Sequence, residues 1–174
     1  LGNHAWAVDA IENLVEKGII KGVSANKFAP ANQITRADFA ILLVRAWALE
    51  SEDKGEFADV SAADYFANEV AIASGLGIVK GLGEGKFAPK ASITREQMMV
   101  MLYRTLTAVE AEIEAAEADV LAQFADADKV SDYAVEAVAT MVANGYIQGA
   151  NGNINPQGNA TRAEVAVLLD RILG

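Results

Sequence analysis

The sequence predicts an all-α fold made of three copies of one helix–loop–helix repeat. Three motifs recur in the same order: a helix end such as Gly-Ile-Ile-Lys-Gly, an apolar residue two places before a proline, and Thr-Arg-x followed by an acid or an amide. They begin at residues 18, 28 and 35, at 77, 87 and 94, and at 145, 154 and 161. An order of motifs that is kept three times indicates repeats that share one hydrophobic core.

The spacing of the motifs divides the chain. The second copy follows the first at an offset of 59 residues, and the third follows at 68 residues and then, after a missing loop residue, at 67. We predict repeat 1 at residues 1–50, repeat 2 at 56–106 and repeat 3 at 123–174. Phe-Ala-Asp opens the second and third copies, at 57 and 124. Its absence from the first copy predicts that repeat 1 is trimmed at its N-terminus.

Apolar residues at helical spacing mark both helices of each copy. In the first copy they include Val8, Ile11 and Leu14, and the predicted helix ends at a glycine. The second helix starts at the repeated threonine and is apolar on several sides, which predicts a central position. Residues 107–122 are rich in alanine and glutamate, with apolar residues at helical spacing. They are predicted to form an acidic helical insertion whose charges are solvated.

The composition excludes several classes of function. The formal net charge of −10 opposes binding to nucleic acid or to an anionic membrane surface. The absence of cysteine excludes disulfides and thiolate zinc sites, and we expect neither a cofactor nor a metal. The single histidine, His4, and the lack of a Gly-x-Ser-x-Gly run argue against a serine hydrolase, so we predict a protein that is not an enzyme. A stretch from Asp126 begins like a calcium loop but lacks its turn glycine.

The repeated threonines are predicted to cap the second helices. A threonine at the N-cap with Asp, Gln or Glu three residues later forms a capping box, in which each side chain accepts a backbone amide of the other residue. Each cap contributes about 1 kcal/mol, so the role of these residues is predicted to be structural. The pairs are Thr35 with Asp38, Thr94 with Gln97, and Thr161 with Glu164.

An arginine follows the threonine in every copy, at Arg36, Arg95 and Arg162. A cation in the first turn of a helix opposes the helix dipole, so stability alone does not explain the pattern. The free amides of a helix N-terminus and a guanidinium can together clamp a carboxylate or a phosphate. The alternative is an arginine that pairs with a neighbouring acid or packs its stem over the loop.

Two further repeated positions are candidate contacts for a ligand. A polar residue precedes a glycine, which lets a ligand or another part of the backbone approach closely. The lysines among these residues could instead complement the helix dipole. An aromatic residue stands early in each first helix, where it could stack on a sugar ring or anchor the core. The positions are Lys21 with Gly22, Lys80 with Gly81, Gln148 with Gly149, and the aromatics Trp6, Tyr65 and Tyr133.

Taken in order, Phe-x-Asp, Trp-Ala, Gly-Ile-Ile-x-Gly, Phe-x-Pro and Ile-Thr-Arg-Ala-Asp resemble the S-layer homology repeat over nearly the whole chain apart from residues 107–123. The resemblance implies a pseudo-threefold spindle around a shared helical core, with grooves between neighbouring repeats. It also implies an extracellular module that anchors its parent surface protein to the cell wall of a Gram-positive-type bacterium. The ligand would be an anionic secondary cell-wall polysaccharide with pyruvylated N-acetylmannosamine, whose carboxylate would pair with Arg36, Arg95 and Arg162.

The copies depart from that pattern, which predicts unequal sites. In the second copy the acid of the Thr-Arg motif stands one place earlier, and Gln148 replaces a lysine in the third. We predict sites built mainly from the arginines of the first two copies, with Lys21 and Lys80. The alternative function is a helical-repeat scaffold for protein–protein interaction or self-assembly. A scaffold would not need an arginine at the start of every second helix.

Overall fold

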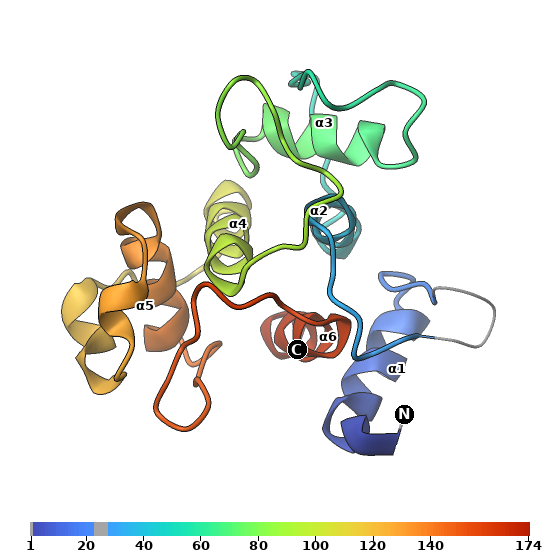
Figure 1. Ribbon diagram of the computed structural model, residues 1–174. Coiled ribbons are helices and arrows are strands. Elements are labelled where there is room, and N and C mark those ends of the chain that lie inside the picture. The colour runs from blue at the N-terminus through green and yellow to red at the C-terminus, as the bar shows by residue number, and fades with distance from the viewer. Residues whose placement is uncertain (1, 23–27) are drawn as a thin grey trace.

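The computed structural model describes residues 2–22 and 28–174. Each repeat contributes one outer and one central helix. The outer helices are α1 (Val8–Glu16), α3 (Ala67–Gly75) and α5 (Val135–Ala143), and the central helices are α2 (Arg36–Ala46), α4 (Arg95–Ala108) and α6 (Arg162–Leu173). Short 3₁₀ helices lie at Gly2–Ala7, Ala118–Gln123, Ala127–Lys129 and Asp132–Ala134. Figure 1 shows the central helices nearly end-on around the middle of the molecule, with the outer helices as three arms. The predicted all-α, three-repeat fold is confirmed.

The repeats interlock, so that one sequence repeat is not one packing unit. Helix α3 packs on α2, α5 packs on α4, and α1 closes the circle by packing on α6. Each outer helix therefore covers the central helix of the preceding repeat. A single repeat would leave its apolar surfaces without a partner, which is the usual reason that such repeats occur together.

The central helices carry the core. Phe39 and Leu43 of α2, Leu102 of α4, and Val165 and Leu169 of α6 are fully buried. These helices are apolar on several sides because each contacts both the axis of the molecule and an outer helix. The central position predicted from the sequence is therefore confirmed.

A closed ring of three backbone hydrogen bonds joins the repeats at the axis. The amide of Ile34 donates to the carbonyl of Ala160 at 3.2 Å, Ala160 donates to Ile93 at 3.1 Å, and Ile93 donates to Ile34 at 3.0 Å. All three residues are buried. Buried backbone groups require partners, and here each repeat supplies one to the next. The ring fixes the segments that immediately precede the central helices.

The acidic insertion is mostly not helical, which corrects the prediction for residues 107–122. Helix α4 ends just before Glu110, whose φ of 53° lies in the left-handed region. The chain then runs extended, and Ile113 packs against the core while the acids on either side of it are exposed. The amide of Glu114 donates to Asn144 Oδ1 of the neighbouring repeat at 2.9 Å. The alternation of acid and apolar residues is the period of an extended segment, and α5 supplies bonds that a helix would make internally.

In repeats 2 and 3 the aspartate of the Phe-Ala-Asp motif fixes the loop before the proline. The Asp126 carboxylate accepts the amides of Ile154 and Asn155 at 2.8 and 2.7 Å. Asp59 holds the equivalent two amides in repeat 2. Burial raises the pKa of Asp126, but the amides of Ile154 and Asn155, its own amide and the charge of Lys129 together outweigh burial, and the pKa lies below its usual value. The aspartate that resembled the start of a calcium loop thus has both oxygens engaged by backbone.

Replacing Asp126 with asparagine is expected to lower the free energy of unfolding by about 2 kcal/mol at pH 7, because charge-assisted hydrogen bonds to two amides are lost. The folded-state pKa is depressed, so the stabilisation is present above the unfolded pKa of about 3.9 and is lost as the pH falls through the folded value. Urea unfolding at several pH values measures the difference. Asp128→Asn, at an exposed position two residues away, is the control. A difference between D126N and the wild type that does not shrink as the pH is lowered below about 3.9 would contradict the assignment.

Candidate ligand-binding grooves

The three repeated arginines tie each repeat to the next. Each Nε donates to the carbonyl of the apolar residue that stands two places before proline in the following repeat. Two of the guanidinium groups also lie over the aromatic ring of that residue, at 4.8 Å for Arg36 and 4.7 Å for Arg162. This contact is the packing over the loop that the sequence left open as an alternative. The bonds run from Arg36 to Phe87, from Arg95 to Ile154 and from Arg162 to Phe28, each at 2.9 Å.

The amides at the start of the central helices are not available to an anion. The amide of Arg36 donates to the carbonyl of Ala91 at 2.9 Å, and that of Ala37 donates to Pro89 at 3.0 Å. Helices α4 and α6 repeat these bonds to the loop of the following repeat. The expected clamp of helix amides plus guanidinium is therefore wrong in its first half. Any anion at this position must be held by side chains.

The threonines cap the central helices, and the residues three places later behave differently. Thr94 with Gln97 and Thr161 with Glu164 form complete capping boxes. Thr35 accepts the amide of Asp38, but Asp38 does not return the bond, because its carboxylate accepts the Tyr65 hydroxyl at 2.6 Å. Partial burial and this hydrogen bond raise the pKa of Tyr65 to about 12.

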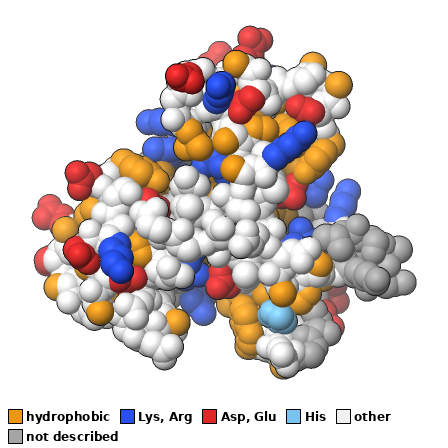
Figure 2. All heavy atoms as spheres, in the orientation of Figure 1, with side chains coloured by type: hydrophobic (Ala, Val, Ile, Leu, Met, Phe, Trp, Pro, Cys, Tyr) orange, Lys and Arg blue, Asp and Glu red, His pale blue; other side chains and the backbone are white. Residues whose placement is uncertain are grey.

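The lateral surface is recessed between the arms, and Figure 2 shows lysine and arginine side chains gathered in these recesses. The first recess, named groove I, is a cavity of about 580 Å³ between repeats 1, 2 and 3. Burial, and to a lesser degree the charge of the nearby Arg104, lowers the pKa of Arg36. In the described part of the chain Arg36 has no carboxylate within ion-pair distance. Groove I is lined by Arg36, Lys80, Gly81, Glu96, Arg104 and Tyr133, among others.

The second recess, named groove II, is a larger cavity of about 820 Å³. Its arginine is neutralised, because Arg95 Nη1 lies 3.0 Å from a carboxylate oxygen of Glu164. The lysine of groove I is replaced by Gln148, as the sequence indicated. Groove II is lined by Trp6, Arg95, Gln148, Gly149, Glu164 and Arg171, among others.

The third inter-repeat position brings Arg162 to Lys21, whose carbonyl accepts Arg162 Nη2 at 3.0 Å. It borders residues 23–27, which lie outside the described part of the chain. At all three positions, the arginine of one repeat lies near the loop of the next repeat that carries the repeated lysine or glutamine followed by glycine. The prediction that the arginines of copies one and two are joined by Lys21 and Lys80 is therefore wrong for Lys21. Lys80 lies beside Arg36, and Arg95 lies beside Gln148.

Sequence reasoning missed a second repeated arginine. Arg45, Arg104 and Arg171 stand nine residues after the first set and follow the same offsets. Arg104 Nη1 donates to the carbonyl of Ile78 at 3.4 Å, and Arg171 Nη1 donates to Tyr146 at 2.8 Å. Each bond turns a guanidinium toward the recess at the end of an outer helix. The constant spacing of nine residues was a sufficient signal in the sequence.

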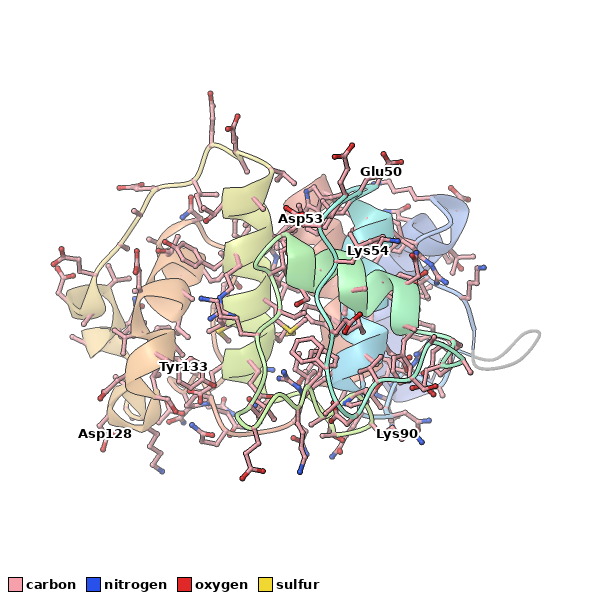
Figure 3. All side chains as sticks on the ribbon, turned by 90° about the horizontal axis from the view of Figure 1, so that it is seen from above. Glu50, Asp53, Lys54, Lys90, Asp128 and Tyr133 are labelled. Atoms are coloured by element: carbon pink, nitrogen blue, oxygen red, sulfur yellow. The ribbon has the colours of Figure 1, made fainter. Side chains whose placement is uncertain are left out.

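The aromatic candidates are exposed rather than anchored in the core. Trp6, Tyr65 and Tyr133 are 57%, 72% and 59% exposed. In Figure 3, Tyr133 and Lys90 both lie in the lower part of the view, and Lys54 lies above them. Trp6 and Tyr133 line the two grooves, where exposed rings are suited to contact a ligand.

The glycines have a structural explanation. A side chain at Gly81 would meet the carbonyl of Lys86 at 2.8 Å, and one at Gly149 would meet the carbonyl of Asn153 at 2.5 Å. Their own loops therefore require glycine, whether or not a ligand approaches. Gly22 lies next to the undescribed residues 23–27, and the structure gives no comparable distance for it.

Glu96, the displaced acid of the second copy, is a hub between repeats 2 and 3. It is only 2% exposed. Its carboxylate accepts the amide and hydroxyl of Ser131 at 3.0 and 2.7 Å, the Tyr133 hydroxyl at 3.2 Å and Gln157 Nε2 at 2.9 Å. Burial and the nearby Glu96 charge raise the pKa of Tyr133. The hub thereby positions the Tyr133 ring at the edge of groove I.

Within the described residues, the structure contains no group of three or more His, Asp or Glu side chains that could hold a metal ion. None of the helices described is both long and apolar enough to cross a membrane.

The chain belongs to the S-layer homology domain family, which it matches at residues 1–40, 56–99 and 123–166. It is 36% identical over 174 residues to an amylopullulanase of Thermoanaerobacterium thermosulfurigenes and 35% identical over 172 residues to the surface-layer 125 kDa protein of Lysinibacillus sphaericus. These matches cover 97% of this chain but only 9% and 14% of the relatives. An S-layer protein of Bacillus anthracis is 29% identical over 168 residues.

Family membership supports attachment to the cell wall in general, through a module that is itself non-catalytic. The relatives that are named as surface-layer proteins are proteins of the cell surface. The enzymatic name of the amylopullulanase describes a protein of which this chain spans less than a tenth. In these relatives the matched segment is one part of a much longer chain.

Proposed function

We propose that groove I binds the carboxylate of a pyruvylated sugar in an anionic secondary cell-wall polysaccharide. The module would thereby anchor a longer surface protein to the wall of a Gram-positive-type bacterium. The observation that carries the proposal is the convergence of Arg36, Arg104 and Lys80 in one recess of a protein with a net charge of −10. Like charges placed together on an acidic chain need a functional reason, and an anionic ligand supplies one.

The groove offers a distinct role to each side chain. Arg36 is held rigidly through Nε, which leaves its Nη atoms for a carboxylate. Arg104 is anchored by Ile78 and adds a second guanidinium. Lys80 is exposed at the rim and adds charge. Tyr133, positioned by Glu96, presents an exposed ring for the apolar face of the sugar.

The double variant Lys80→Gln with Arg104→Gln tests the proposal, because it removes two positive charges and leaves the Arg36–Phe87 bond in place. Its affinity for purified cell walls that carry the polysaccharide is expected to fall about a hundredfold, since charged pairs at a binding site contribute several kcal/mol. Sedimentation binding measures the loss. Lys54→Gln, which does not line groove I and lies apart from Tyr133 in Figure 3, is the matched control and should bind normally. Unchanged binding by the double variant would favour the protein-scaffold function.

A further inference from the structure

We propose that groove II binds an uncharged sugar unit of the polymer, whereas groove I binds a unit that carries a carboxylate. The inference rests on the proposed function for its biological setting, but its physical argument concerns groove II alone. Two of the cationic positions of groove I are changed here. Arg95 is paired with Glu164 at 3.0 Å, and the lysine is replaced by the neutral Gln148.

Arg171 and Lys129 also line groove II, but the charge distribution around Arg95 itself disfavours a carboxylate ligand there. The guanidinium of Arg95 is doubly engaged, through Nε to the carbonyl of Ile154 and through Nη1 to Glu164. A ligand carboxylate at Arg95 would have to displace Glu164 or lie beside it. Glu164 is also fixed by its capping bond with Thr161, so it cannot leave without loss of the cap. The carboxylates of the ligand and of Glu164 would then repel each other in a partly desolvated recess.

The same features favour hydroxyl groups. Glu164 supplies a carboxylate acceptor, and Gln148 and Asn153 supply amide donors and acceptors. Each of these side chains can pair with the hydroxyls of a pyranose without a charge on the ligand. The cavity volume of about 820 Å³ lies in the range of small-molecule sites.

Trp6 gives the recess an apolar platform. Trp6 lines groove II and is 57% exposed, although most of the surface of a tryptophan side chain is usually buried. The corresponding residue of groove I is a tyrosine held by the Glu96 hydrogen bond. An indole presents the larger surface to the C–H face of a sugar ring. Groove II therefore combines an aromatic platform, amides and a carboxylate, and Arg95, its counterpart of Arg36, is already paired.

The test follows the two indole N–H resonances of the protein by NMR, and Trp6→Phe identifies the signal of Trp6. The methyl glycoside of N-acetylmannosamine is expected to shift the Trp6 resonance, and Trp6→Ala is expected to weaken binding of this glycoside, measured by calorimetry, about tenfold. The pyruvylated glycoside should perturb Trp6 at concentrations about tenfold higher than the neutral one. Glu164→Gln should reduce that difference, because it removes the competing carboxylate.

Two results would overturn the inference: no shift of the Trp6 resonance by the neutral sugar, or a stronger response of Trp6 to the pyruvylated sugar. The outcomes are separable from those of groove I. If K80Q/R104Q retains wall binding while Trp6 responds to the neutral sugar, groove I fails and groove II stands. If Trp6 does not respond while K80Q/R104Q loses wall binding, only the assignment of groove II is overturned.

Discussion

Replacing Phe87 with alanine is expected to lower the free energy of unfolding by about 3–5 kcal/mol. Phe87 is fully buried and stacks on Phe57 with ring centroids 5.3 Å apart. It also lies beneath the Arg36 guanidinium and supplies the carbonyl that Arg36 Nε contacts. Truncation leaves a cavity at the junction of repeats 1 and 2 and removes a cation–π contact. Urea unfolding followed by far-ultraviolet circular dichroism measures the change.

Phe28→Ala is the matched control for that experiment. Phe28 occupies the equivalent position in repeat 1 and lies under Arg162 at a similar distance, but it is only partly buried. Its truncation should therefore cost clearly less than that of Phe87. Equal losses for the two variants would show that burial at the repeat junction does not set the stability.

Replacing Glu96 with alanine is expected to destabilise the protein by about 3 kcal/mol, because four hydrogen-bond donors lose a buried charged acceptor. The amide of Ser131 is the donor with the fewest alternatives, since it belongs to the backbone. The equivalent positions in the other repeats are Ala37 and Ala163. Alanine is thus compatible with the helix itself, and the loss should come from the contacts with repeat 3. Urea unfolding provides the measurement, with the exposed Glu112→Ala as control.

A second readout separates the hub from a simple packing effect. The pKa of Tyr133 is raised by burial and by the Glu96 carboxylate. Glu96→Gln keeps the size of the side chain and removes its charge, so the pKa of Tyr133 should move down toward the ordinary value of about 10. Ultraviolet titration of the tyrosines measures it. A Tyr133 that titrates identically in E96Q and in the wild type would mean that the carboxylate does not position the ring.

The fold was predictable because its signals are local. Helical spacing of apolar residues, glycines at helix ends and the threonine caps each act within about ten residues. The acidic insertion was not predictable in this way. Ile113 fits a helical and an extended period equally well, and the choice depends on hydrogen bonds from Asn144, thirty residues away from Glu114.

The candidate site was predictable in its residue types but not in its pairings. Arg36, Arg95 and Lys80 line the two described grooves, yet which lysine accompanies which arginine depends on the interlocking of the repeats. The engagement of the helix amides by the following loop has no signature in the sequence of the helix. The pairing of Arg95 with Glu164 also depends on the interlocking of the repeats. By position Arg95 corresponds to Arg36 and Glu164 to Gln97, so the ion pair joins two neighbouring repeats.

Calorimetric titration of the folded protein with pyruvylated N-acetylmannosamine glycoside, and with the same sugar lacking pyruvate, tests the central claim most directly. The account predicts that the pyruvylated sugar binds in groove I, with a heat that disappears in K80Q/R104Q and persists in K54Q. The neutral sugar should give only the Trp6-dependent binding of groove II. Binding of the pyruvylated sugar that is unaffected by K80Q/R104Q, or no binding of it to the folded protein, would contradict the assignment of groove I as the carboxylate site.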